Sequence, residues 1–203
     1  MLKKLSRNEA FEKFPAFPKR DYIEEKDEEI FFSPQTFEAF ILTVSSTSIN
    51  NHVKLLASQL KILLSELDID TLTFLGDTDT PWRYQKNDYK PAKEALLFLE
   101  ENRIGKKFNG ALQIDTTSLN PFIKHLFWLT RCNATLAYIH FIDNRQHLVG
   151  HICKYGIIHL HSLNKNTNAL LKKAFDKTSF QQIDQCIDPF NNYGPIKGRQ
   201  IKL

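Results

Sequence analysis

The sequence predicts an α+β fold: a mixed sheet with an early strand–helix–strand unit and a late antiparallel meander, with helices packed on the sheet. The early unit begins with a near-continuous apolar run over residues 36–44, which is typical of a buried strand. Ser48 can cap a helix in which apolar residues recur at helical spacing through residue 67. A second short apolar run at 71–75 gives the next strand.

The meander is indicated by three apolar segments, at about 134–142, 147–155 and 157–162. The polar residues 143–146 and the glycine at Gly156 supply the turns between them. Short turns of this kind join antiparallel neighbours, so this half of the sheet should be antiparallel.

The remaining segments complete the sheet and cover it. We expect one further strand, at 108–115, and helices beginning at Pro91 and Asn120 and at about 166–176 and 179–186. Residues 1–20 are predicted to form an extended arm, because its prolines at positions 15 and 18 interrupt any regular helix through them. The predicted organisation is this arm, a single α+β domain over 21–188, and an irregular tail over 189–203.

Composition excludes several classes of protein. The 203 residues include 27 Lys and Arg against 23 Asp and Glu, a net charge of +4, and no apolar run long enough for a membrane helix. No apolar segment follows the basic residues at the N-terminus, so we expect no signal peptide.

The three cysteines, Cys132, Cys153 and Cys186, are far apart and odd in number, which favours free thiols and a cytoplasmic location. The alternative is that they share one metal site.

Five of the seven histidines lie between residues 140 and 161, within the meander. If a turn over 143–146 pairs residue 142 with 147, then residue 140 lies opposite 149. Strand alternation then divides the first two strands into a polar and an apolar face. The polar face carries Tyr138, His140, Ile142, His147, Val149, His151 and Cys153, and the apolar face carries Ala137, Ile139, Phe141, Leu148, Gly150 and Ile152.

The third strand of the meander needs a choice of register. A turn around Gly156 with an odd number of residues puts Ile158 and Leu160 on the apolar face. His159 and His161 then join the polar face. A two-residue turn would put the histidines on the apolar face and the two aliphatic residues on the polar face. The apolar pattern favours the turn with an odd number of residues.

A face rich in imidazole and thiol groups has the ligands that Zn²⁺ prefers. The candidate metal ligands on it are His151, His159 and His161, for zinc or another transition metal. The prevailing expectation is that no cofactor is bound, with zinc as the alternative. Other interpretations remain open: a half-exposed sheet face, a face covered by the N-terminal arm or a partner, or an acid–base or pH-sensing role.

The loop after the strand at 71–75 is the second candidate site. Asp77 and Asp79 follow the end of the strand, where carboxylates are well placed for a divalent cation. Trp82, Arg83 and Tyr84 are residue types enriched at binding hot spots. The alternative is a surface loop capped by its own Asp side chains.

No complete catalytic motif occurs in the chain, so the sequence favours a non-enzymatic protein-binding module of the inhibitor, immunity or accessory type. Its candidate binding residues are Trp82, Arg83, Tyr84, Tyr138, His140, His151, His159 and His161. The alternative is a metal-assisted hydrolase that uses the histidine-rich face or Asp77 and Asp79. A nucleic-acid partner is disfavoured because the charge is small and no aromatic–basic motif is present. The oligomeric state stays open.

Overall fold

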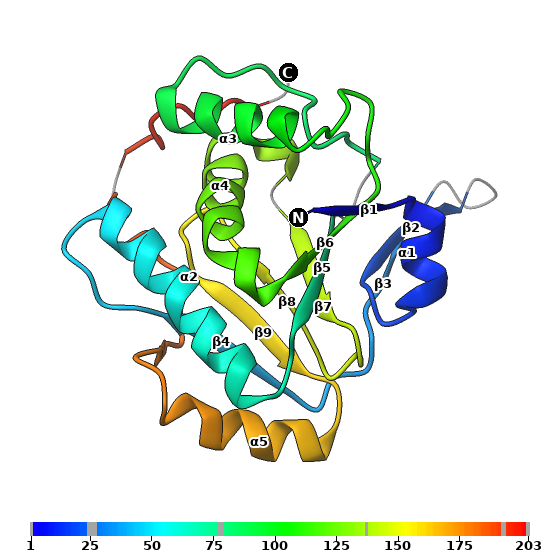
Figure 1. Ribbon diagram of the computed structural model, residues 1–203, viewed down its shortest axis with the longest axis vertical. Helices are drawn as coiled ribbons and strands as arrows, with labels where there is room; N and C mark the ends of the chain where they lie inside the picture. Colours follow the sequence, from blue (N-terminus) through cyan, green and yellow to red (C-terminus); the bar gives the residue numbers. More distant parts are fainter. Residues whose placement is uncertain (1, 24–27, 77–78, 137, 192–193, 202–203) are drawn as a thin grey trace.

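The computed structural model describes residues 2–23, 28–76, 79–136, 138–191 and 194–201. Figure 1 shows one sheet with helices packed against it, which confirms the predicted α+β class. Within this part of the chain, none of the helices combines the length and the apolar character needed to cross a bilayer.

Ten strands are present in the described residues. They are β1 (Lys3–Leu5), β2 (Lys19–Ile23), β3 (Glu28–Phe32), β4 (Glu38–Thr43), β5 (Thr71–Gly76), β6 (Ala111–Asp115), β7 (Ile139–Asp143), β8 (Leu148–Ile152), β9 (Ile158–Ser162) and β10 (Gln181–Gln182). Eight of them form one sheet in the order β1-β6-β5-β7-β8-β9-β4-β10, and β2 pairs with β3 as a separate hairpin. Every neighbouring pair is antiparallel. Strands β4 and β5 run in the same direction but are separated by β7, β8 and β9.

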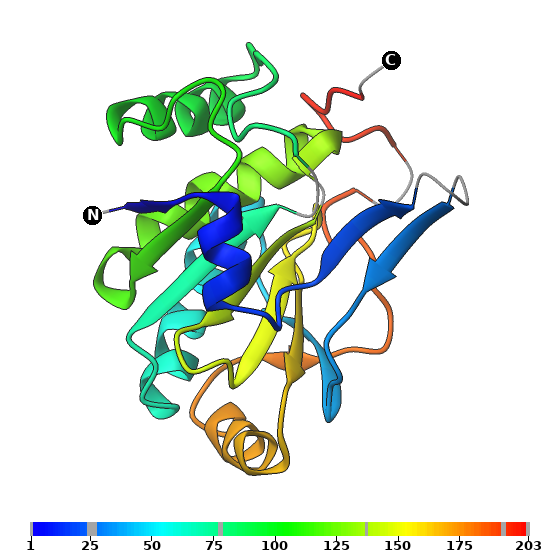
Figure 2. The same cartoon turned by 90° about the vertical axis from the view of Figure 1, so that its right-hand side faces the viewer.

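The helices divide between the two faces of this sheet. They are α1 (Arg7–Lys13), α2 (Ile49–Glu66), α3 (Lys90–Glu101), α4 (Leu119–Cys132) and α5 (Lys165–Phe175). The main core holds apolar residues of α2, α3, α4 and α5 together with one face of the sheet. Helix α1 packs on the opposite face, where Ala10 and Phe14 contact Leu75, Ala111 and Ile142 (Figure 2).

Two segments differ from their predicted form. Within residues 1–20, expected to be extended, strand β1 joins the sheet and helix α1 follows it. The helix begins at a Ser6–Glu9 capping box and ends before Pro15. Residues 179–186, predicted as a helix, contain β10 instead, since Gln181 and Gln182 pair with β4.

The faces of the meander are as predicted, but the pairing of its first two strands is not. His140 lies opposite His151, and Ile142 lies opposite Val149, so the register is displaced by two residues from the predicted one. The connection still has four residues, but they are 144–147, one position later than predicted. The buried Asp143 carboxylate stabilises this turn by accepting hydrogen bonds from the backbone N–H groups of Arg145, His147 and Leu148. A displacement of two residues preserves the face of every side chain.

The turn between β8 and β9 has an odd number of residues, as the pattern predicted. Ile152 pairs with Ile158, which leaves residues 153–157 as the connection. Gly156 has φ 76°, a left-handed conformation that favours glycine. His159 therefore shares a face with His140 and His151, as expected.

Candidate functional site

Three histidines form a row across the centre of the sheet, one from each of β7, β8 and β9. His140 lies opposite His151, and His151 lies opposite His159. The His140 and His151 rings are 5.3 Å apart between centroids, and the His151 and His159 rings stack at 4.5 Å with 3° between their planes. Adjacent positions on neighbouring strands thus bring the three imidazoles into direct contact.

Burial keeps these imidazoles neutral. It lowers the pKa of His140 to about 4 and that of His151 to about 3, and neighbouring histidines contribute further lowering. The pKa values of His159 and His161 are lowered by burial as well. Neutral imidazole is the form that binds metal ions, so the row is ready to act as a ligand without losing protons.

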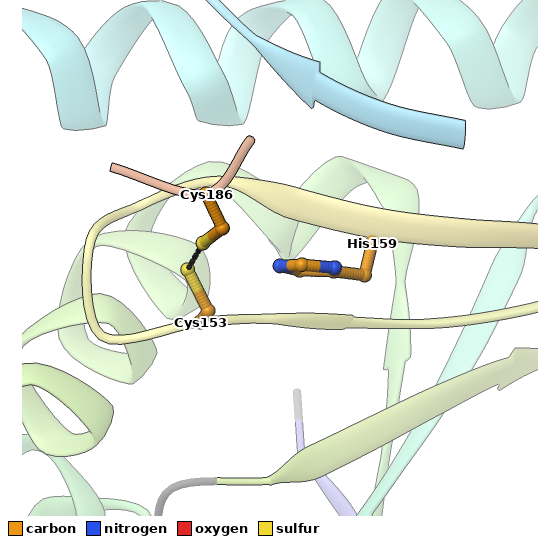
Figure 3. A group of neighbouring side chains, drawn as sticks. All are labelled: Cys153, His159 and Cys186. Atoms are coloured by element: carbon orange, nitrogen blue, oxygen red, sulfur yellow. Dashed lines mark hydrogen bonds between the residues drawn. The ribbon is translucent and has the colours of Figure 1, made fainter. Parts of the chain in front are cut away.

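Cys153, His159 and Cys186 form a cluster at one end of this row (Figure 3). One donor atom from each residue lies within 4.8 Å of the other two, and the two Sγ atoms are 3.3 Å apart. Figure 3 shows the two sulfurs facing each other and the His159 ring pointing a nitrogen toward them. In the part of the chain that the structure describes, this is the only place where at least three potential metal ligands converge.

A buried histidine of helix α2 holds the turn after β8 in place. The His52 Nε2 of helix α2 donates to the Gly156 carbonyl oxygen over 2.8 Å, and the His52 side chain is fully buried. The Cys153 amide donates to Ile157 across the same turn. His52 thus holds the turn that presents Cys153.

Arg131 ties together the two segments that carry the cysteines. One guanidinium nitrogen donates to the Lys154 carbonyl, one residue beyond Cys153. The other forms an ion pair of 2.9 Å with Asp188, two residues beyond Cys186. Both side chains are almost completely buried, so the pair lies in a low dielectric and its geometry is well defined.

The donor set fits zinc. Two thiols and one imidazole are a common ligand set for Zn²⁺, and tetrahedral bonds of about 2.3 Å would place two sulfurs about 3.8 Å apart. The observed 3.3 Å between Cys153 and Cys186 needs only a small separation of these side chains. Burial and contact with Cys153 raise the pKa of the Cys186 thiol to about 12, and a bound cation would reverse that preference by stabilising the thiolate.

The three histidines predicted as metal ligands do not converge on one point. Of His151, His159 and His161, only His159 belongs to the converging cluster. His151 stacks flat on His159, and His161 lies opposite Val149 and Ala39. The sequence pattern placed Cys153 on the correct face. Of the three cysteines that were the alternative shared metal site, Cys153 and Cys186 converge and Cys132 does not. Cys186 reaches the site from the irregular segment after β10.

A cavity of about 560 Å³ lies between the β2–β3 hairpin and the histidine row. The sheet side is formed by Tyr138, His140 and His151, and the hairpin side includes Phe31 and Phe32. Phe31 is 64% exposed, Phe32 53% and Tyr138 53%. These exposed rings give the cavity an open, aromatic lining, which includes three of the predicted binding residues, Tyr138, His140 and His151.

The loop after β5 does not present the surface that its sequence suggested. Trp82 is 2% exposed, donates its indole N–H to the Gly110 carbonyl and packs near Phe122, so it belongs to the core. Arg83 pairs with Glu100 of α3, which leaves Tyr84 as the exposed ring of the predicted trio.

Only one of the two predicted carboxylates of this loop, Asp79, lies in the described residues. Asp77 lies outside the described residues. Asp79 is largely exposed and pairs with Arg7 of helix α1 over 3.2 Å. No converging ligand group in the described ranges includes Asp79.

Comparisons with protein-family models, with curated proteins and with solved structures found no match to this chain.

Proposed function

We propose that this protein binds Zn²⁺ through Cys153, His159 and Cys186. The observation that carries the proposal is the convergence of two sulfurs and one imidazole nitrogen within 4.8 Å, from three separate segments of the chain. Each segment is positioned by other contacts: the sheet holds His159, and Arg131 links the segments of both cysteines. Such supporting contacts orient ligands in zinc sites.

Three protein ligands leave one position of a tetrahedral ion for water or substrate. Catalytic zinc sites have this arrangement, whereas structural sites use four protein ligands. A metal-assisted hydrolase is therefore the enzymatic form of the proposal, and the chemistry that zinc would supply is a bound water of lowered pKa. We retain the cytoplasmic location as part of the proposal, because reducing conditions keep the two thiols able to bind metal.

Metal titration of chelator-treated protein tests this proposal. We expect one zinc ion per chain, with a rise in stability of about 2.7 kcal/mol when free zinc is a hundredfold above the dissociation constant. Cobalt in place of zinc should show charge-transfer absorption from the thiolates. Cys153→Ser, Cys186→Ser and His159→Asn should each remove binding. Cys132→Ala is the matched control, because Cys132 is buried against the Lys197 carbonyl, outside the cluster. Zinc binding that persists in all three ligand variants would refute the site.

A second candidate function is the protein-binding module that the sequence favours. The exposed rings of Phe31, Phe32 and Tyr138 around the cavity support it, because large exposed aromatic groups mark interaction surfaces. A partner should bind immobilised wild-type protein and be lost with Phe32→Ala and Tyr138→Ala. Phe37→Ala is the control, since Phe37 is equally exposed but does not line the cavity. The purified partner should bind the wild type and the Phe37→Ala control and should not bind Phe32→Ala or Tyr138→Ala. Equal binding to all variants would contradict the proposal.

A further inference from the structure

We infer that Cys153 and Cys186 are a modification site: they form a reversible disulfide when no metal bridges them. Their sulfurs are 3.3 Å apart, against about 2.05 Å in a disulfide bond. Both thiols are free and both side chains are partly exposed. The inference concerns the same two thiols as the proposed zinc site, and its chemistry does not depend on zinc binding.

The surrounding backbone allows the sulfurs to close this gap. Cys153 begins the turn after β8, and Cys186 lies in the irregular segment between β10 and Asp188. Neither residue belongs to a strand. The Cys153 backbone is bonded to Ile157 and Gly156 across the turn, so rotation of the two side chains must close the gap. The Arg131 contacts keep the two segments together, which maintains a high effective concentration of one thiol at the other.

The oxidant that we assign to this reaction is a peroxide. One thiolate attacks a peroxide oxygen, the O–O bond breaks, and with proton transfer the products are a sulfenic acid and water. The second thiol attacks the sulfenic sulfur, the S–S bond forms and a second water leaves. Two thiols have then lost two electrons and two protons, and one hydrogen peroxide has become two waters. Two equivalents of a small thiol such as glutathione return both cysteines to the reduced form.

Formation of this bond would remove two of the three proposed zinc ligands. His159 alone holds zinc weakly, so oxidation should release the ion, and bound zinc should slow oxidation by occupying both sulfurs. Cys132 should take no part. It is buried, its Sγ lies against the Lys197 carbonyl, and it does not belong to the cluster that brings the other two sulfurs together.

Thiol counting by mass spectrometry tests the inference. Metal-free protein treated with hydrogen peroxide, unfolded and alkylated with N-ethylmaleimide should carry one adduct, at Cys132, where untreated protein carries three. A peptide linked through residues 153 and 186 should appear and should vanish after reduction. Cys186→Ser should form no such link, whereas Cys132→Ala should form it normally. Three adducts after oxidation, or a link that involves Cys132, would overturn the inference.

The same experiment with zinc-loaded protein separates this inference from the proposed function. Release of one zinc ion for every two thiols lost supports both. A disulfide in a protein that binds no zinc refutes the proposed function and leaves the inference intact. Zinc binding in a protein that forms no disulfide refutes the inference and leaves the proposed function intact.

Discussion

Arg131 and Asp188 form a buried ion pair, with 2.9 Å between guanidinium nitrogen and carboxylate oxygen, in side chains that are only 6% and 5% exposed. The same guanidinium donates to the Lys154 carbonyl, so a single side chain of α4 connects both segments that carry the cysteines. This connection is the central support of the candidate metal site.

Loss of this support should reduce both stability and metal affinity. Arg131→Met leaves the Asp188 carboxylate buried without its partner, so the free energy of unfolding should fall by about 3–5 kcal/mol. Zinc affinity should fall by about 10- to 100-fold, the usual effect of removing a group that supports metal ligands. Urea unfolding and zinc titration measure the two effects. Arg145→Met is the control: Arg145 pairs with Asp68 at the surface, and its loss should cost less than about 1 kcal/mol.

The turn that carries Cys153 should tolerate no side chain at Gly156. Its φ of 76° strains any other residue, and an added Cβ would lie 2.8 Å from Phe127 and 3.0 Å from His52. Gly156→Ala should therefore lower the free energy of unfolding by about 2–3 kcal/mol. Gly105→Ala is the matched control, because a Cβ there meets nothing within 4 Å. Equal effects of the two substitutions in urea would contradict this account of the turn.

The histidine row should make the metal-free protein sensitive to mild acid. The pKa of His140 is about 4 in the folded protein against about 6.5 when exposed, so the unfolded chain binds the proton first. The stabilisation is complete above about pH 6.5 and is lost as the pH falls toward 4, a difference of about 2–3 kcal/mol for this residue. Urea unfolding between pH 7 and pH 4 measures the slope. His140→Phe should reduce it, and an unchanged slope would show that His140 does not carry the effect.

Trp82 should affect stability and not partner binding. Trp82→Phe removes the hydrogen bond to Gly110 and leaves that carbonyl buried, which should cost about 1–3 kcal/mol. Chemical unfolding should detect this loss. Zinc titration and partner binding to the folded variant should match the wild type, and a selective loss of either would place Trp82 in a binding role.

Alternation along the strands made the faces of the meander predictable. His140, His151 and His159 share a face because the side-chain period of a strand is two, whatever the exact pairing. The pairing itself fits the position of Asp143, whose carboxylate accepts hydrogen bonds from three backbone N–H groups of the turn at 144–147 and of Leu148. Such bonds between a side chain and the backbone leave no periodic pattern in a sequence. The predicted register therefore differs from the observed one by two residues.

The cysteine cluster depends on long-range contacts, and for that reason it was only partly predicted. Cys153 follows from strand alternation, but Cys186 is brought to it by Arg131 and Asp188, which are 57 residues apart. No local pattern identifies such a pair. Trp82 shows the opposite error: its residue type suggested a binding surface, but its position beside Phe122 and Gly110 places it in the core.

The strand order has a consequence for synthesis of the chain on the ribosome. Strand β4 is made early, yet its two neighbours in the sheet are β9 and β10, which follow it by more than 110 residues. An emerging polypeptide must therefore hold β4 unpaired while most of the protein is translated. Pairings over such sequence separations form slowly. The nascent chain is exposed to chaperones and to misassembly until residue 182 has left the exit tunnel, and Cys186 reaches its partners only after that point.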